Sequence, residues 1–187
     1  MPTTATICEL GSAAVDFDLP GVDGRRHRLA DLRGPRGLLL MFICNHCPYV
    51  KAILPRIVRD AHALQAMGIG VAAISSNDAE AYPEDAFPEM ISLAWREGFR
   101  FPYLYDAEQQ VARDYDVVCT PDFYGYDANL QLRYHGRLDG SRKEALPDAP
   151  RELFEAMRAV AEGREAPEEQ VPSIGCSIKW RKEIAPS

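Results

Sequence analysis

The stretch LLLMFICNHCPYVKAIL, residues 38–54, places two cysteines between a continuously apolar run and an amphipathic segment. The run 37–43 is apolar at every position after its first glycine, a pattern typical of a strand covered on both faces of a sheet. Apolar residues then recur at helical spacing over about 48–67, and Gly68 supplies a helix stop. Because a second apolar run follows at 69–74, we expect a right-handed strand–helix–strand crossover with the cysteines at its first corner.

The flanking segments extend this unit into a larger sheet. An alternation of apolar and charged residues with a turn at Asp23-Gly24 predicts an N-terminal β-hairpin extension at about 14–30. Further along the chain, helical patterns alternate with short strand-like runs, and a second hairpin turns at 127–129. Helices are expected at about 85–96, 107–117 and 149–162, and a short strand at 101–106. The fold class is therefore α/β, with a central mixed β-sheet flanked by helices.

The length and composition predict one domain followed by a tail. A chain of 187 residues with 47% hydrophobic content can bury a sizeable core and is close to the usual size of one domain. The last predicted helix ends at Gly163, so the domain spans 1–163. Residues 164–187 contain three prolines and no long periodic segment. We expect them to form a C-terminal tail that packs on the domain or extends from it.

Charge and hydropathy exclude some classes of partner. The net charge is -7 and no long basic block is present, so we expect no nucleic-acid partner. The longest apolar runs are much shorter than the roughly 20 residues that a membrane-spanning helix needs, so we expect no membrane insertion. The N-terminus lacks both the basic start and the apolar stretch of a signal peptide. The expected location is the cytoplasm.

The cysteines point to redox or metal chemistry. Five cysteines are an odd number and are too widely spread for the disulfide framework of a small secreted domain. Cys44 ends the predicted strand just before a helix, so the free N–H groups and dipole of that helix are expected to lower its pKa below about 8.5 and make it a nucleophile. Cys47, one helical turn later, is the natural resolving thiol. His46 is expected to stabilise the Cys44 thiolate.

Several segments carry a family resemblance. The order Cys44-Asn-His-Cys47 after an apolar strand, Thr120-Pro121 before a hairpin, and the closing helix resemble a thioredoxin-fold redox protein. The N-terminal FDLPGVDGRRHRLADLRG resembles the opening of the redoxin branch. More closely, FICNHCPYVKAI, RYHGR and IGCSIKW resemble bacterial peroxiredoxin-like thioredoxin-family proteins of the alkyl hydroperoxide reductase/thiol-specific antioxidant superfamily.

The resemblance implies a thioredoxin-like fold and a thiol-disulfide oxidoreductase. Pro121 is then a cis-proline that faces the redox cysteines and helps to align a partner's disulfide. Cys44 attacks that disulfide and Cys47 releases the reduced partner. The partner is a protein disulfide or dithiol or a low-molecular-weight thiol, with an upstream thiol reductase, and no organic cofactor or metal is expected.

Two other functions remain open. A thiol peroxidase would convert Cys44 to a sulfenic acid that Cys47 resolves. However, when Cys47 is aligned with the cysteine of the peroxiredoxin pattern Pro-x-x-x-Thr-x-x-Cys, Leu40 and Cys44 stand where that pattern has Pro and Thr. A metal-binding module is the third hypothesis. A zinc site would have to add two ligands from among Cys119, Cys176 and His135 to the pair, since a structural zinc usually needs four ligands.

The remaining candidates each have a second interpretation. Cys119 is expected close to the site, either as a disulfide acceptor or as a small buried hydrophobic residue. Cys176 is either a resolving thiol brought from a distance or a packed residue of the tail. His135 lines a pocket or occupies an exposed strand position. Cys8 is given no role.

Overall fold

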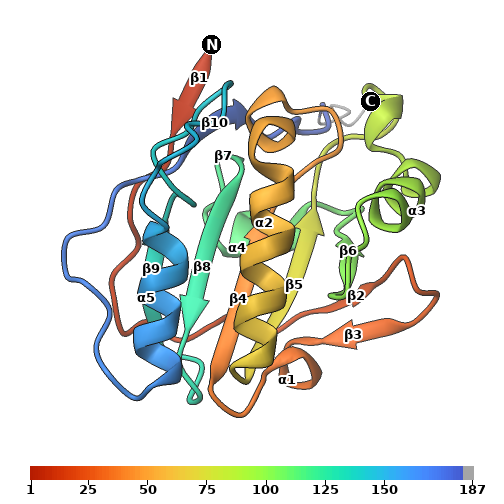
Figure 1. Cartoon of the computed structure of the whole chain (residues 1–187). Helices are drawn as coiled ribbons and strands as arrows, with labels where there is room; N and C mark the ends of the chain where they lie inside the picture. Colours follow the sequence, from red (N-terminus) through yellow and green to blue (C-terminus); the bar gives the residue numbers. More distant parts are fainter. Residues whose placement is uncertain (183–187) are drawn as a thin grey trace.

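The computed structural model describes residues 1–182 and contains a central five-stranded sheet. Its strand order is β6–β5–β4–β8–β9, formed by Tyr103–Tyr105, Ile69–Ser75, Gly37–Phe42, Asp122–Tyr126 and Leu132–Gly136. β4 pairs in parallel with β5, and β5 with β6, whereas the β4–β8 and β8–β9 pairs are antiparallel. The mixed central sheet expected from the sequence is confirmed (Figure 1).

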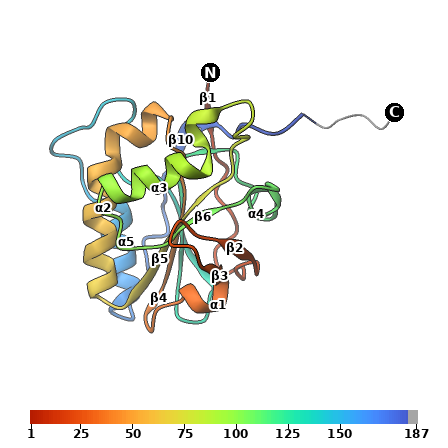
Figure 2. The same cartoon turned by 90° about the vertical axis from the view of Figure 1, so that its right-hand side faces the viewer.

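Helices cover both faces of this sheet, as Figure 2 shows. On one face lie α2 (Pro48–Ala66), α3 (Phe87–Arg96) and α5 (Glu152–Ala161). On the other lie α1 (Leu29–Leu32), α4 (Gln110–Asp114) and the hairpin of β2 (Asp18–Pro20) and β3 (Arg26–Arg28). A 3-10 turn, η1 (Pro83–Asp85), precedes α3. The flanked sheet and the N-terminal hairpin therefore match the predicted fold class.

One predicted helix is much shorter than expected. The pattern at 107–117 predicted a full helix, but α4 covers Gln110–Asp114. Gln109 and Asp116 both have a positive φ, at 60° and 53°, which interrupts the helical path at each end. The buried carboxylate of Asp106 accepts the backbone N–H groups of the first turn instead. Local capping therefore limited the helix.

A second, three-stranded sheet joins the two ends of the chain. Its order is β1–β10–β7, formed by Pro2–Thr4, Ile174–Ser177 and Cys119–Thr120, and both pairs are antiparallel. The described part of the predicted tail, 164–182, thus returns to the domain and places β10 beside β7. Residues 183–187 of that tail lie outside the described residues.

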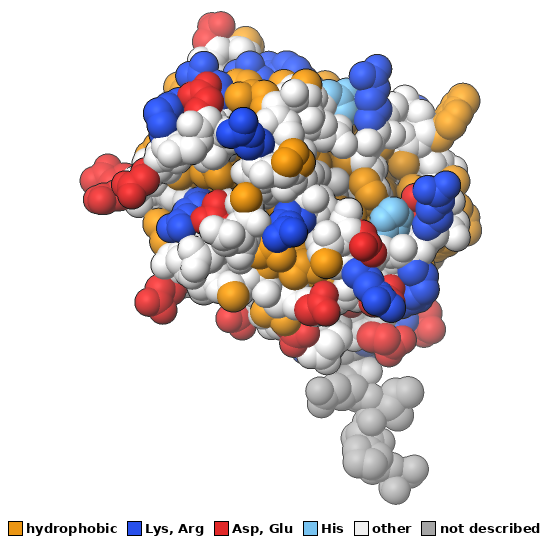
Figure 3. Space-filling model, turned by 90° about the horizontal axis from the view of Figure 1, so that it is seen from below, with side chains coloured by type: hydrophobic (Ala, Val, Ile, Leu, Met, Phe, Trp, Pro, Cys, Tyr) orange, Lys and Arg blue, Asp and Glu red, His pale blue; other side chains and the backbone are white. Residues whose placement is uncertain are grey.

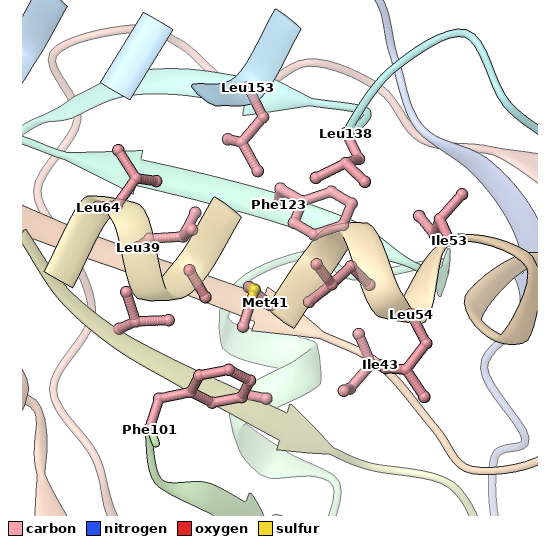
Figure 4. Close-up of a cluster of buried hydrophobic side chains, with 14 of the residues drawn as sticks. Leu39, Met41, Ile43, Ile53, Leu54, Leu64, Phe101, Phe123, Leu138 and Leu153 are labelled. Carbon is pink, nitrogen blue, oxygen red and sulfur yellow. The ribbon is translucent and has the colours of Figure 1, made fainter. Parts of the chain in front are cut away.

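The side chains of β4 alternate between two apolar layers. Leu39, Met41 and Ile43 pack toward α2 and α5, as Figure 4 shows. Leu38, Leu40 and Phe42 pack into the opposite layer with α1, α4 and β8. Full burial of such a side chain stabilises the fold by about 1.5–3 kcal/mol. The sheet is therefore held from both sides.

The charged groups on the surface are mixed in sign. Figure 3 shows Lys and Arg side chains interspersed with Asp and Glu on one face of the molecule. Among residues 1–182, no helix combines the length and the apolar character that a membrane span requires.

Leu64, a buried residue of α2 in the layer between this helix and the sheet, tests this packing. It is fully buried, so Leu64→Ala is expected to lower the free energy of unfolding by about 2–5 kcal/mol, because the cavity is only partly refilled. The matched variant Leu10→Ala, at a position that is 41% exposed, should change it by less than about 1 kcal/mol. Urea denaturation of the two reduced variants measures the difference, and equal losses would contradict this account of the core.

Candidate active site

The Cys44–Cys47 pair occupies the corner between β4 and α2. Residue 42 ends the strand, and Cys47 is the N-cap of the helix, whose first residue is Pro48. Both cysteines are reduced and at most 1% exposed. A proline suits the first helical turn because its missing N–H has no partner there anyway. The pair was predicted at the corner between this strand and this helix, and the structure places it there.

Thr120 contacts both sulfurs from the facing strand β7. Its Oγ1 lies 3.5 Å from the Sγ of Cys44, and its carbonyl oxygen lies 3.3 Å from the Sγ of Cys47, where it can accept the thiol hydrogen. The next peptide bond, Thr120–Pro121, is cis, as the resemblance implied. The structure thus brings Cys44, Cys47 and the Thr120–Pro121 segment together.

The negative charge of the pair is favoured on Cys47. Interaction with the Cys44 thiol lowers the pKa of Cys47 to about 5, against the opposing effect of burial. Further contributions come from the Cys176 thiol and from the N–H of Val50 in the first helical turn, although that N–H lies outside regular capping geometry. The Thr120 side chain lowers the pKa of Cys47 further, so the thiolate is favoured although the thiol can also donate to the Thr120 carbonyl oxygen.

The expectation that Cys44 would have the lowered pKa is wrong. Its role as donor to Cys47 raises the pKa of Cys44 well above the usual value, and burial and the negative charge of Asp85 act in the same direction. The physical reason is the helix start. Because Cys47 rather than Cys44 caps α2, the helix N-terminus favours charge on Cys47.

Asp85 holds the loop between the two cysteines. Its side chain is fully buried, and its Oδ1 accepts the backbone N–H groups of Asn45 at 2.8 Å and His46 at 3.2 Å. Its Oδ2 accepts the Asn77 amide at 2.8 Å and lies 2.5 Å from the Nδ1 of His46. Tyr103 donates its hydroxyl to the Asn45 side chain at 2.9 Å. The two residues between the cysteines are therefore fixed by both main-chain and side-chain contacts.

Sequence reasoning missed Asp85. It lies in a polar segment with a neighbouring acid, Glu84, and neither periodicity nor spacing distinguishes the two. In the structure they differ sharply, because Glu84 is exposed and reaches the loop only through its carbonyl oxygen, which accepts the Asn45 amide. Only a contact across 40 residues of sequence reveals which acid serves the site.

His46 lies at the rim of the site rather than on the Cys44 sulfur. Its Nδ1 faces Asp85, and its ring stacks on Tyr82 with the centroids 5.5 Å apart. The ammonium group of Lys179 lies 5.8 Å from the centre of the Tyr82 ring. His46 was expected to stabilise the Cys44 thiolate, and the hydrogen-bond partner of its Nδ1 is instead the Asp85 carboxylate. His46, Tyr82 and Lys179 form a partly exposed border, which we call the rim.

One group of side chains in the described structure could hold a metal ion. Single ligand atoms of Cys44, His46 and Asp85 lie within 4.8 Å of one another. Both oxygens of Asp85 already accept hydrogen bonds from the loop, so an ion would have to compete with the contacts that shape the site.

His135 is not the exposed or pocket-lining residue expected from the sequence. It is 1% exposed, with Nε2 at 3.1 Å from the Asp122 carboxylate and Nδ1 accepting the Cys8 backbone N–H at 2.9 Å. Burial opposes its charge, but the hydrogen bond with Asp122 outweighs that effect and raises the pKa of His135 to about 9. His135 therefore belongs to a buried hydrogen-bonded pair with Asp122 of β8, not to the zinc set considered with Cys119 and Cys176.

The other two cysteines near the pair differ in accessibility. Cys119 is fully buried, its Sγ lies 4.0 Å from the Ser173 carbonyl oxygen, and burial raises its pKa to about 12. This environment fits the interpretation of a small buried hydrophobic residue. Cys176, on β10, is half-buried and lies opposite Thr120 in the strand pairing.

Comparisons with known proteins place this chain in a family. The model of the AhpC/TSA family matches residues 10–135. The chain is 30% identical over 131 residues to the thiol-disulfide oxidoreductase ResA of Geobacillus thermodenitrificans, covering 70% of this chain and 71% of that protein.

Two solved structures are similar over almost the whole chain. An uncharacterized conserved protein from Geobacillus kaustophilus is 45% identical with a TM-score of 0.93, and the match covers 97% of each chain. A hypothetical protein from Sinorhizobium meliloti 1021 is 40% identical with a TM-score of 0.91, covering 96% of this chain and 98% of that one.

The lowered pKa of Cys47 gives a titration test. As the pH rises through about 5, the reduced protein should gain one thiolate, seen as ultraviolet thiolate absorbance. Cys47→Ser should abolish this step, whereas the matched variant Cys119→Ser should retain it, since Cys119 titrates near 12. A step that survives in Cys47→Ser would assign the thiolate to another cysteine.

The lowered pKa of Cys47 also determines whether the free energy of unfolding rises or falls with pH. Between about 5 and the ordinary thiol pKa of about 8.5, the unfolded chain holds a proton on Cys47 that the native state has released. The contribution of Cys47 to stability should therefore rise with pH across this window and disappear below about 5. Urea denaturation of reduced wild type against Cys47→Ser at several pH values measures it.

Asp85→Asn tests the loop contacts. The amide places N–H donors where the Asn77 amide and His46 need an acceptor, so the reduced protein should lose about 1–3 kcal/mol of stability. Glu84→Gln removes the neighbouring charge but keeps the backbone contact to Asn45, and should be near neutral. If urea denaturation gives the same stability for both variants, Asp85 does not organise the loop.

Proposed function

Because this chain belongs to the AhpC/TSA family and is a thiol-disulfide oxidoreductase of the thioredoxin fold, we propose that its Cys44-Asn-His-Cys47 pair exchanges disulfides with a partner. One observation carries the proposal. Two reduced cysteines share one favoured negative charge at the end of a buried strand, beside Thr120–Pro121. A thiolate is the species that attacks a disulfide.

The reaction begins at Cys44. Its sulfur attacks one sulfur of the partner disulfide, forming a mixed disulfide while the other partner sulfur leaves as a thiolate. The proton of Cys44 passes to Cys47, the thiolate with which it interacts in the reduced pair. That proton then passes to the departing partner thiolate, which regenerates the Cys47 thiolate.

The second step closes the pair. The Cys47 thiolate attacks the Cys44 sulfur, the Cys44–Cys47 disulfide forms, and the second partner sulfur leaves as a thiolate that takes a proton from water. Two electrons have then moved from the pair to the partner. Run backward, the same steps oxidise a partner dithiol.

Pro121 is proposed to position the partner. It follows Thr120, whose side chain and carbonyl group contact the two sulfurs, so a partner chain that reaches Cys44 also meets Pro121. The rim of His46, Tyr82 and Lys179 borders the same site. A protein disulfide or dithiol is the proposed partner, and a cytoplasmic thiol reductase returns the pair to the reduced state.

The test is disulfide reduction with single-cysteine variants. Wild type should reduce the disulfides of insulin in the presence of dithiothreitol, whereas Cys44→Ser and Cys47→Ser should lose the activity because each lacks one half of the couple. Cys47→Ser should also accumulate a mixed disulfide at Cys44. The matched control Cys119→Ser should keep wild-type activity. Full activity in Cys44→Ser would remove the proposal.

The family match keeps a thiol peroxidase as the second candidate. In that reaction Cys44 would become a sulfenic acid and Cys47 would resolve it. Against it, when Cys47 is aligned with the cysteine of the peroxiredoxin pattern, residues 40 and 44 are Leu and Cys where that pattern has Pro and Thr, and Leu40 is buried in the core. Stoichiometric peroxide decides between the two candidates. Rapid loss of the two thiols, much faster than for a free thiolate, would favour the peroxidase.

A further inference from the structure

A third cysteine reaches the redox pair from the far end of the chain. In the antiparallel pairing of β10 with β7, Cys176 lies opposite Thr120. Thr120 is also the residue that contacts Cys44 and Cys47, so Cys176 approaches the pair across the same backbone segment. Cys176 packs against the apolar cluster that contains both cysteines. The three thiols therefore belong to one cluster built from two distant parts of the sequence.

Gly175 makes this close approach of β10 to β7 feasible. A Cβ atom at this position would lie 1.9 Å from the carbonyl oxygen of Thr120 and 3.2 Å from the nitrogen of Pro121. Neither is the end of a flexible side chain, so any larger residue would push the two strands apart. On its other side, β10 pairs with β1, where Cys176 lies opposite Pro2. The strand that carries Cys176 is thus held on both edges.

Cys47 is the sulfur whose pKa both other thiols lower. It interacts with the Cys44 thiol and with the Cys176 thiol. The sulfur between two others is the one through which a disulfide can pass from the first to the third, since exchange proceeds by attack of a thiolate on a bonded sulfur. Cys119 is adjacent in sequence to Thr120 but points to the Ser173 carbonyl, and does not interact with the Cys47 thiol in this way.

The three thiols also differ in access to solvent. Cys44 and Cys47 are at most 1% exposed, whereas Cys176 is half-buried. A soluble thiol that must reduce the oxidised pair therefore meets Cys176 more easily than either buried sulfur. Reduction by an external thiol requires contact between sulfurs, and Cys176 offers a soluble thiol an approach besides the one that the partner disulfide takes to Cys44.

We propose that Cys176 is a third redox cysteine that carries the disulfide from the buried Cys44–Cys47 pair to the surface for reduction by an external thiol. This inference rests on the proposed function of the pair. The Cys176 thiolate attacks the Cys47 sulfur, the Cys47–Cys176 bond forms, and Cys44 leaves as a thiolate that takes up a proton. No electrons are gained or lost in this step.

An external thiol then completes the reduction. A first thiolate attacks the Cys176 sulfur, forms a mixed disulfide with it, and releases Cys47 as a thiolate. A second thiolate attacks the external sulfur of that mixed disulfide, releasing the oxidised external disulfide and the Cys176 thiolate. Two external thiols have supplied two electrons, and the protein again holds three reduced cysteines.

The charges around Cys176 favour the first step once the pair is oxidised. In the reduced protein, burial and the interaction with Cys47 raise the pKa of Cys176 to about 11. When Cys47 is bonded to Cys44, it carries no negative charge, so that part of the increase is lost. The ammonium groups of Lys179 and Lys143, which lower the pKa of Cys176, remain.

The first experiment asks whether the Cys47–Cys176 bond forms. The full-length Cys44→Ser variant is oxidised with diamide, blocked with an alkylating agent and mapped by peptide mass spectrometry. We expect a Cys47–Cys176 disulfide. It should persist when Cys119→Ser is added and disappear when Cys176→Ser is added instead.

The second experiment asks whether the bond lies on the reaction path. Oxidised wild type, Cys176→Ser and Cys119→Ser are each reduced with glutathione, and the loss of the Cys44–Cys47 disulfide is followed with time. Reduction should be at least about tenfold slower in Cys176→Ser and unchanged in Cys119→Ser. Cys176→Ala, with circular dichroism to verify folding, should repeat the effect without a hydroxyl group.

The two proposals fail in different ways. If Cys44–Cys47 forms in wild type but Cys47–Cys176 never forms, or if Cys176→Ser is reduced at the wild-type rate, the role of Cys176 is overturned and the function of the pair stands. If Cys44–Cys47 does not form in wild type, the proposed function itself fails, whatever Cys176 does.

Discussion

The complete burial of β4 is the constraint on which the rest of the molecule depends. Every residue of Gly37–Phe42 is buried, so both faces of this strand must be covered. The chain meets that demand with α2, α3 and α5 on one face and with α1, α4 and the hairpin on the other. The loop 43–47 joins the end of this strand to the start of α2, so its two sulfurs lie at the end of the buried strand and are still shielded from water.

Because both sulfurs are shielded from water, the surrounding protein groups determine which of them carries the negative charge. A buried thiolate is disfavoured by the loss of water unless hydrogen bonds replace it. Cys47 has such partners in two neighbouring thiols, at the start of α2, whereas Cys44 faces the Asp85 carboxylate. The site therefore holds one negative charge on Cys47 and a proton on Cys44. This arrangement keeps a base beside the sulfur proposed to attack.

Buried polar side chains support the site on both sides. Asp85 binds the loop between the cysteines. On the other side, Asp122, the residue after Pro121, is hydrogen-bonded to His135. Each pair is costly to break, because removing one partner leaves the other buried without compensation. Asp85 thus holds the loop that carries the cysteines, and the Asp122–His135 contact holds the Thr120–Pro121 segment that faces them. The rim of His46, Tyr82 and Lys179 remains accessible. Such a division fits a site that must hold its sulfurs in place and still admit a partner.

The sequence by itself determined the central strand, the crossover helix, the hairpin and the corner position of Cys44 and Cys47, because local periodicity and turn residues carry that information. The resemblance to a family predicted the cis peptide bond before Pro121, which the structure has. Tertiary structure alone decided which sulfur bears the charge, which of two adjacent acids binds the loop, and that His135 is buried. It also decided that Cys176 reaches the pair. These features depend on contacts between residues far apart in the sequence, such as Asp85 and Asn45, or on the exact start of a helix. Long-range contacts and exact helix starts leave no periodic signal in the sequence.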